Sequence, residues 1–283
     1  MTELMMQPTV HEALAFGRAE LSDSLSPDVD VQILLCHVLD CTPTRLHVSP
    51  EHELEAQQWQ LFNQLVERRK QGEPVAHLTG SRGFWSLDLL VDNSTLIPRP
   101  DTELLVSLAL SKIKPNMTVV DLGTGTGAIA LSLAAEKADI DVIATDFSFA
   151  ALQLAQKNAN RHALEQVRFI NMSWLVGFKS ASFDLVVSNP PYIEMRDPHL
   201  NQGDVRFEPL SALVSGPDGL EDIRQIVVQA AKCLKKDGWL LVEHGYQQSA
   251  AVQQLFTDAG FEHISAHQDF GGQDRAVMGQ LTL

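Results

Sequence analysis

Short apolar runs alternate with helical stretches from about residue 115 onward, and this alternation constrains the fold more than any other feature of the chain. Alternating strands and helices predict a parallel sheet covered by helices, which is an α/β architecture. The expected strands are Val119-Val120, Ile140 to Thr145, Val167 to Ile170, Phe183 to Ser188, 239–243, 262–268 and 275–281, and the expected helices are 128–136, 148–162, 220–235 and 247–259.

The N-terminal part has the period of helices instead. The second of its helices is expected to end near Gln71-Gly72, where the basic run Arg68 to Lys70 suits the helix dipole better than a nucleic-acid patch. A small helical domain is therefore predicted over residues 1–75. The apolar residues that repeat at helical spacing are Val31, Leu34, Leu35, Val38 and Leu39, then Leu54, Leu61, Phe62, Leu65 and Val66.

A linker is predicted between the two parts, over residues 76–100. Glu73-Pro74 breaks the preceding helix, and residues 83–91 have the pattern of a strand that can belong to a β-hairpin. Pro98 and Pro100 then delay regular structure until Asp101 or Thr102 can cap the next helix. The third part of the chain spans residues 101–283.

Composition limits the class of partner. The chain has 283 residues and a formal net charge of −15, which disfavours a polyanionic partner such as nucleic acid and favours a protein or small molecule. No apolar run reaches the roughly 18 residues of a membrane-spanning helix, and Met1 to Met6 lack the basic start of a secretory signal. Three scattered cysteines form no C-x-x-C pair, so a reducing cytoplasm is the expected location.

A glycine-rich loop follows the first strand of the predicted sheet. In the segment from Asp121 to Gly127, Gly123, Gly125 and Gly127 alternate with Thr124 and Thr126, so that the backbone can turn tightly and approach a ligand closely. Asp146 stands at the end of the next strand, where an acidic side chain can accept hydrogen bonds from both ribose hydroxyls. These residues predict a nucleoside site at the switch point of the sheet.

The spacing of the glycines distinguishes two kinds of nucleoside. Dinucleotide sites use G-x-G-x-x-G, whereas this loop reads G-x-G-x-G and follows the acidic Asp121. A carboxylate there would repel a pyrophosphate but would attract the ammonium and sulfonium groups of S-adenosylmethionine. The loop favours S-adenosylmethionine as the cofactor; taken alone, a glycine turn in another doubly wound fold remains the alternative.

A second motif, Asn189-Pro190-Pro191-Tyr192, follows the fourth strand. Ligands of open α/β sheets bind beyond the carboxyl ends of the strands, so the tetrapeptide is expected to face the cofactor. The Asn189 side-chain oxygen and the Pro190 carbonyl are two acceptors beside an aromatic ring, an arrangement that suits a planar NH₂ group. A rigid turn without chemistry is the alternative for the tetrapeptide alone.

Together the two motifs resemble those of methyltransferases that act on exocyclic or amide nitrogen, and most closely the HemK/PrmC-type release-factor glutamine methyltransferases. The resemblance covers the chain from about residue 70 to its end and pairs Leu96-Ile-Pro-Arg-Pro-Asp-Thr-Glu103 with Asn189 to Tyr192. The further matching segments are Pro74 to Gly80, Phe84-Trp85, Asp121 to Gly127, Gln202 to Leu210 and Glu243-His-Gly245.

The resemblance implies a fold and a reaction. The fold is a Rossmann-like, seven-stranded class I methyltransferase sheet with a small N-terminal helical substrate-recognition domain and a β-hairpin linker. The reaction moves a methyl group from S-adenosylmethionine to the side-chain amide nitrogen of the glutamine in the Gly-Gly-Gln loop of peptide-chain release factors.

The resemblance also implies roles for individual residues. Asn189, Pro190 and Tyr192 are the expected catalytic residues, and with Pro191 they bind the substrate. Trp174 is expected near the adenine, after Ser173, where the family often has an acidic residue that can bond the adenine amino group. The implied cofactor-binding residues are Asp121, Gly123, Thr124, Gly125, Thr126, Gly127, Asp146, Ser173, Trp174 and Asn189.

Two other functions stay open at this point. The same tetrapeptide serves enzymes that methylate N6 of adenine or the exocyclic nitrogen of guanine in nucleic acids, although the charge of −15 counts against them. A non-catalytic scaffold would be expected to have a damaged tetrapeptide, and this one is intact. No metal site is expected, because His263 and His267 have no accompanying ligands. Gly271-Gly272-Gln273 is interpreted as a turn between the last two strands and not as a self-substrate.

Overall fold

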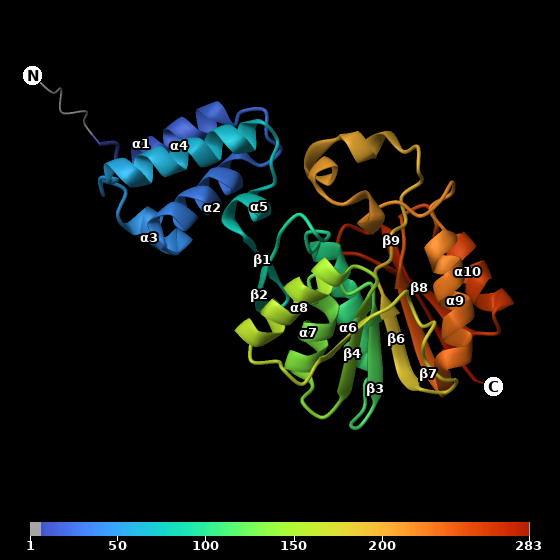
Figure 1. Ribbon diagram of the computed structural model, residues 1–283. Coiled ribbons are helices and arrows are strands. Elements are labelled where there is room, and N and C mark those ends of the chain that lie inside the picture. Colours follow the sequence, from blue (N-terminus) through green and yellow to red (C-terminus); the bar gives the residue numbers. More distant parts are fainter. Residues whose placement is uncertain (1–6, 283) are drawn as a thin grey trace, which may run out of the picture. The chain divides into compact units, whose positions relative to one another are not determined.

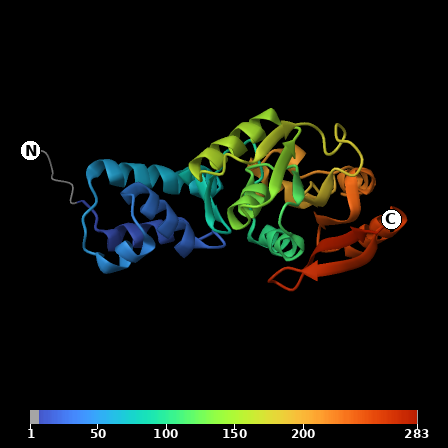
Figure 2. The same cartoon turned by 90° about the horizontal axis from the view of Figure 1, so that it is seen from below.

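The computed structural model describes residues 7–282, so the segment Met1 to Met6, which was examined for a signal, lies outside them. The chain forms two compact units (Figures 1 and 2). The helical unit contains the residues up to Gly80 together with Gly203–Phe207, and the sheet unit contains Ser81–Gln202 and the residues from Glu208 onward. The boundaries predicted at residues 75 and 100 stay predictions.

The helical unit is built from α1 (Val10–Glu20), α2 (Pro27–Leu39), α3 (Pro43–Val48), α4 (Ala56–Lys70) and α5 (Val75–Thr79). The two predicted helical patterns correspond to α2 and α4, and α4 ends at Lys70 as expected. The capping box of Thr9 and Glu12 starts α1, a helix that the apolar pattern did not predict. Pro74 ends the preceding segment, but it also provides the start of the short α5.

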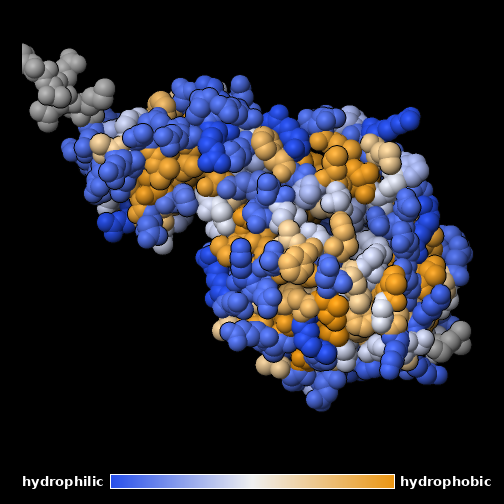
Figure 3. Space-filling view, in the orientation of Figure 1, coloured by the Kyte–Doolittle hydropathy of each residue, from blue (hydrophilic) through white to orange (hydrophobic). Residues whose placement is uncertain are grey.

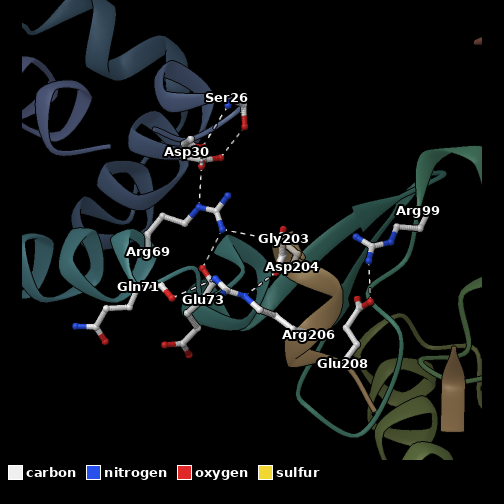
Figure 4. A network of polar contacts seen from close by, with 11 residues as sticks. Ser26, Asp30, Arg69, Gln71, Glu73, Arg99, Gly203, Asp204, Arg206 and Glu208 are labelled. Atoms are coloured by element: carbon white, nitrogen blue, oxygen red, sulfur yellow. Dashed lines mark hydrogen bonds and ion pairs between the residues drawn. The ribbon is translucent and has the colours of Figure 1, made fainter. Parts of the chain in front are cut away.

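A partly buried arginine, Arg69, links α2 and α4 of the helical unit to a segment that is distant in the sequence (Figure 4). Arg69 of α4 donates to Asp30 of α2 and to Asp204, at 2.8 Å in both cases. Arg206 donates to the Gln71 carbonyl oxygen at 3.3 Å. The five residues Gly203–Phe207, a 3₁₀ segment (η3), therefore belong to the helical unit although both of their flanks belong to the sheet unit.

The sheet unit contains a seven-stranded sheet in the order β5-β4-β3-β6-β7-β9-β8. Neighbouring strands from β5 to β7 pair in parallel, and β9 is antiparallel to both β7 and β8. The predicted Rossmann-like, seven-stranded sheet is confirmed, with β7 starting five residues before its expected first residue, Trp239. The strands are β3 (Thr118–Leu122), β4 (Asp141–Asp146), β5 (Arg168–Asn171), β6 (Phe183–Ser188), β7 (Leu234–Glu243), β8 (Glu262–Gln268) and β9 (Asp274–Leu281).

Helices cover both faces of this sheet. Successive residues of a strand point to opposite faces, so neighbouring residues pack against different helices. Val119 and Leu185 lie in one apolar cluster with α6, α7 and α8, whereas Val120 and Val186 lie in a second cluster with α9 and α10. The helices are α6 (Glu103–Lys112), α7 (Ala128–Glu136), α8 (Phe149–Arg161), α9 (Glu221–Cys233) and α10 (Ser249–Asp258) (Figure 1). The last four match the helices predicted from the sequence within two residues at each end.

Two local predictions need correction. The predicted β-hairpin is confirmed, but residues 83–91 are not one strand of it: β1 (Ser81–Phe84) and β2 (Leu87–Leu90) pair antiparallel, and the turn between them places Trp85 at φ +55°. Thr102 precedes α6, after the 3₁₀ turn η1 (Pro100–Thr102), but its side chain makes no capping hydrogen bond. The Thr102 hydroxyl instead accepts a hydrogen bond from Asn189.

The remaining segments are short. Residues 269–273, which include Gly271-Gly272-Gln273, form the turn between β8 and β9, as interpreted from the sequence. The segment between β6 and α9 carries η2 (Pro198–Asn201), η3 and η4 (Leu210–Ala212). No helix within residues 7–282 is long and apolar enough to cross a membrane. In the face drawn in Figure 3, hydrophilic residues dominate the outer rim of each unit.

Candidate active site

The sheet unit has a pocket at the carboxyl ends of β3, β4 and β6, and it brings most of the predicted site residues together. The glycine loop and the tetrapeptide share this pocket, although more than 60 residues separate them in the sequence. The predicted residues that line it are Gly123, Thr124, Gly125, Thr126, Asp146, Ser173, Trp174, Asn189 and Pro191.

The glycine loop needs its glycines for conformation and for space. Gly123 has φ +67°, and a Cβ there would lie 3.2 Å from the Trp174 ring. Gly127 has φ +86°, and its Cβ would lie 2.9 Å from Leu131 of α7. A side chain at either position would strain the backbone and crowd its neighbour, so glycine lets the loop lie close to both Trp174 and α7.

Asp121 lies beneath the loop and is 1% exposed. One carboxylate oxygen, Oδ2, accepts from the Thr124 hydroxyl at 2.6 Å and from the Ala130 N–H at 3.2 Å. The other, Oδ1, is buried without a hydrogen-bond partner among the described residues. Burial raises the pKa of Asp121 to about 7, so a cation beside it would stabilise the charged form.

Asp146 ends β4 and anchors the loop from the other side. Its Oδ2 accepts from the Gly125 N–H at 3.0 Å and its Oδ1 accepts from the Ser148 N–H at 2.8 Å. Burial raises its pKa, and these backbone hydrogen bonds oppose the rise. Each oxygen keeps a further lone pair, which leaves capacity for hydroxyl donors of a ligand.

Asn189 follows β6 and presents an acceptor to the pocket. Its Nδ2 donates to the Thr102 hydroxyl at 3.0 Å, so the amide nitrogen is already engaged. The side-chain oxygen is the group left for a ligand, as the sequence analysis required. Tyr192 turns away from the pocket lining and donates its hydroxyl to Glu243 at 3.3 Å.

Some predicted residues do not line the pocket. Asp121, Gly127, Pro190 and Tyr192 are not among the residues that line it, although each belongs to the loop or to the tetrapeptide. The roles assigned to individual residues stay predictions. Lining residues that the sequence analysis did not select include Thr95, Thr102, Phe147 and Met172. Thr95 precedes the proline-rich segment Leu96 to Glu103, and Thr102 belongs to it. This segment was the one sequence feature that could have indicated them.

The residues present fit S-adenosylmethionine. The buried Asp121 Oδ1 is an acceptor without a protein donor, and Asp146 can accept from hydroxyls. The buried Thr95 hydroxyl, which also lacks a hydrogen-bond partner among residues 7–282, adds a polar group to the lining. Within the same residues no group of three or more His, Cys, Asp or Glu side chains has the arrangement of a metal site.

Comparison with known proteins agrees with this reading. The PrmC N-terminal domain model matches residues 12–80, and the methyltransferase small domain model matches residues 100–204. A methyltransferase from Pyrococcus furiosus has a similar fold, with a TM-score of 0.55 and 15% identity over 77% of this chain and 98% of that one.

Curated relatives resemble the chain over nearly its whole length. The release factor glutamine methyltransferase of Shewanella oneidensis is 44% identical, covering 97% of this chain and 96% of its own. The release factor glutamine methyltransferase of Escherichia coli K12 is 46% identical, covering 93% and 95%. With the matched domains and the pocket of the sheet unit, this similarity shows that the chain belongs to the release factor glutamine methyltransferase family.

Proposed function

We propose that the chain transfers a methyl group from S-adenosylmethionine to the side-chain amide nitrogen (N5) of the glutamine in the Gly-Gly-Gln loop of peptide-chain release factors. The observation that carries this proposal is the shared pocket of the glycine loop and Asn189. A cofactor held by the loop and an amide held by Asn189 would meet there. The names of the relatives supply the substrate class.

The cofactor supplies an activated methyl group, so the protein mainly has to align the acceptor nitrogen. An amide nitrogen is a poor nucleophile because its lone pair is delocalised into the carbonyl. The Asn189 oxygen and the Pro190 carbonyl can accept the two NH₂ hydrogens and fix the nitrogen toward the methyl donor. The same acceptors stabilise the positive charge that develops on nitrogen as the new bond forms.

The other predicted residues have roles in cofactor binding. The backbone from Gly123 to Gly127 would lie against the cofactor, Asp121 would offset its positive charge, and Asp146 would accept from the ribose hydroxyls. Trp174 would pack near the adenine, where Ser173 offers a weaker acceptor than a carboxylate. The helical unit would recognise the release factor, and the expected location is the cytoplasm.

Nucleic-acid methylation is the second candidate. Asn-Pro-Pro-Tyr can serve N6-adenine and exocyclic-guanine methyltransferases as well. The net charge of −15 would repel a polyanion, and the relatives are named for a protein substrate. We therefore expect no direct contact with nucleic acid.

Transfer of radiolabelled methyl groups tests the proposal. Label should enter a purified release factor and should be lost when the glutamine of its Gly-Gly-Gln loop is replaced. Asn189→Ala should lower the rate by about 10²–10³, the typical effect of removing one preorganised group that stabilises developing charge. Gln273→Ala of the chain itself should label the release factor normally, because its own Gly-Gly-Gln is a strand turn.

A parallel incubation with cell lysate, divided between protease and nuclease, separates the two candidates. Label that resists nuclease and is released by protease supports the protein substrate. Label in rRNA or DNA would contradict the glutamine assignment and support the second candidate.

A further inference from the structure

A chain of hydrogen bonds runs from Asn189 into the interior of the sheet unit. Ser188 of β6 pairs with Val242 of β7, so the next residues, Asn189 and Glu243, lie at the ends of neighbouring strands. Thr102, which is 4% exposed, accepts from Asn189 Nδ2 at 3.0 Å. The Thr102 hydroxyl also interacts with the Glu243 carboxylate and lowers the pKa of that group. Glu243 Oε2 is buried and has no hydrogen-bond donor at full hydrogen-bond geometry among the described residues, so it is free to accept from this hydroxyl.

The buried carboxylate of Glu243 fixes which group donates and which accepts along these hydrogen bonds. Glu243 is 1% exposed, and when it is ionised it can only accept hydrogen bonds. A hydroxyl has a single hydrogen, and the Thr102 oxygen already accepts from Asn189 Nδ2, so its hydrogen is available to the Glu243 carboxylate. The amide of Asn189 is then held with Nδ2 toward Thr102 and with its oxygen on the other side.

The orientation of this amide decides whether the site can bind an NH₂ group. With its oxygen toward the pocket, Asn189 offers an acceptor to the two donors of a primary amide. With the amide turned over, an NH₂ group would face another NH₂ group, and neither could accept a hydrogen bond. The inference below rests on the proposed function, because that function defines the group that Asn189 must accept.

We propose that Glu243 is a positioning residue that acts through Thr102 to hold the Asn189 side-chain oxygen toward the substrate amide. Tyr192 contributes from the tetrapeptide itself, since its hydroxyl donates to Glu243 Oε1 at 3.3 Å. Glu243 does not line the pocket, so its effect on the reaction is indirect.

Protonation of Glu243 should weaken this control. The charged and titratable groups near the carboxylate are Arg275 of β9, Asp101 of η1 and Tyr192. Burial outweighs the favourable contacts with Arg275, Thr102 and Tyr192 and raises the pKa of Glu243 to about 7. A protonated carboxyl can donate to Thr102, which frees the Thr102 hydrogen for the Asn189 oxygen and allows the amide to turn over. The turnover number should therefore fall as the pH decreases through about 7.

Three variants of the full chain test the proposal with a purified release factor as substrate. Thr102→Val and Glu243→Gln should each lower kcat by about 10-fold or more, equivalent to about 1.4 kcal/mol per tenfold. KM for the release factor and the affinity for S-adenosylmethionine should change much less, because Glu243 does not line the pocket and the hydroxyl of Thr102, which does, is engaged by Asn189. Thr102→Ser keeps the hydroxyl and should restore kcat to near that of the unchanged chain.

The pH profile separates positioning from a merely structural role. The fall in kcat between about pH 8 and about pH 6 should flatten in Glu243→Gln, because the group that titrates has been removed. Glu262→Gln, at an exposed position of β8, is the matched control and should keep both the rate and the profile.

Each outcome has a defined meaning. Equal rates for Thr102→Ser and Thr102→Val, or an unchanged pH profile in Glu243→Gln, would overturn the proposal. If Glu243→Gln does not fold, the comparison of kcat between Thr102→Ser and Thr102→Val still tests the proposal. If the unchanged chain fails to label release factors at all, the proposed function fails and not the positioning chain.

Discussion

Asp121 is a carboxylate in surroundings that disfavour its own charge. Only one of its oxygens has protein donors, and it is 1% exposed. The sequence motif places an acidic residue beside the glycine loop, but it did not indicate that one carboxylate oxygen would accept hydrogen bonds from Thr124 and Ala130. A cationic ligand would offset the cost of the remaining charge, so cofactor binding and protonation should be linked.

The raised pKa of Asp121 predicts the direction of a stability change with pH. Folding raises the pKa of Asp121 from its ordinary value of 3.8 to about 7, so the stabilising contribution is complete below 3.8 and is lost as the pH rises through about 7. Between about pH 5.5 and about pH 8.5 the unchanged chain should lose about 2 kcal/mol of unfolding free energy from this residue. Urea denaturation without cofactor at the two pH values measures it.

Asp121→Asn removes the titrating group and should show a loss smaller by that amount over the same range. The exposed Asp258→Asn, at the end of α10, is the control and should follow the unchanged chain. A pH dependence that is the same in all three proteins would contradict the raised pKa.

At the scale of elements, α8 joins the hairpin to the glycine loop through one side chain. Asn158 is completely buried and exchanges two hydrogen bonds with Leu90 of β2, at 2.7 and 3.0 Å. Its Nδ2 also donates to the Thr126 carbonyl oxygen of the loop at 2.9 Å. The amphipathic pattern of α8 predicted the helix, but a buried asparagine on its apolar face gave no indication of these partners.

Asn158→Ala should therefore destabilise the chain and loosen the loop. The change leaves three backbone groups without their partner, and each one that water cannot reach costs about 1–3 kcal/mol, so a loss of at least about 1–3 kcal/mol is expected from the buried Thr126 carbonyl alone. Thermal unfolding measures the loss, and calorimetry should show weaker S-adenosylmethionine binding. Asn160→Ala, two residues further along α8 at an exposed position, should leave both unchanged. An equally small effect at Asn158 would contradict its bridging role.

Prediction of the elements from the sequence worked where period and burial agree. The strands of the parallel sheet are short continuous apolar runs, which fit a buried strand. The helices between them have apolar residues at helical spacing, which fit one buried helix face. The hairpin turn at Trp85 was missed because no glycine or asparagine marks it, although the backbone there has positive φ. Thr102 occupies the predicted N-cap position of α6, but its side chain does not cap the helix. A hydroxyl before a helix is a local signal, whereas its partner Asn189 is distant in the sequence.

At the scale of the whole molecule, the sequence predicted a helical part, a linker and a methyltransferase part, but no sequence pattern indicated that Gly203–Phe207 belongs to the helical unit. Arg68 to Lys70 was read as dipole compensation at the end of α4. The structure gives Arg69 a different role, because Asp30, which is 5% exposed, also accepts from Ser24 and Ser26 and needs a cation. Asp204 comes from so far along the chain that no local pattern could pair it with Arg69.

Arg69→Ala should be costly for the helical unit. Breaking a buried ion pair by removing one partner typically costs about 3–5 kcal/mol, since the other charge stays buried. Arg68→Ala is the neighbouring control, and its exposed pair with Glu73 should be worth only about 0–1 kcal/mol. Chemical denaturation of both variants gives the comparison, and equal losses would show that the Arg69 cluster is not a buried charge network.

Because residues 203–207 belong to the helical unit, cutting the chain after Gly80 does not give a complete helical unit. A fragment that ends at Gly80 would lack Asp204 and Arg206, so Arg69 would lose one of its two carboxylates and the Gln71 carbonyl would lose its guanidinium partner. Exchange of the N-terminal part between relatives would meet the same obstacle. If the helical unit recognises the substrate, as proposed, its preference would be transferred intact only when residues 203–207 were exchanged together with it.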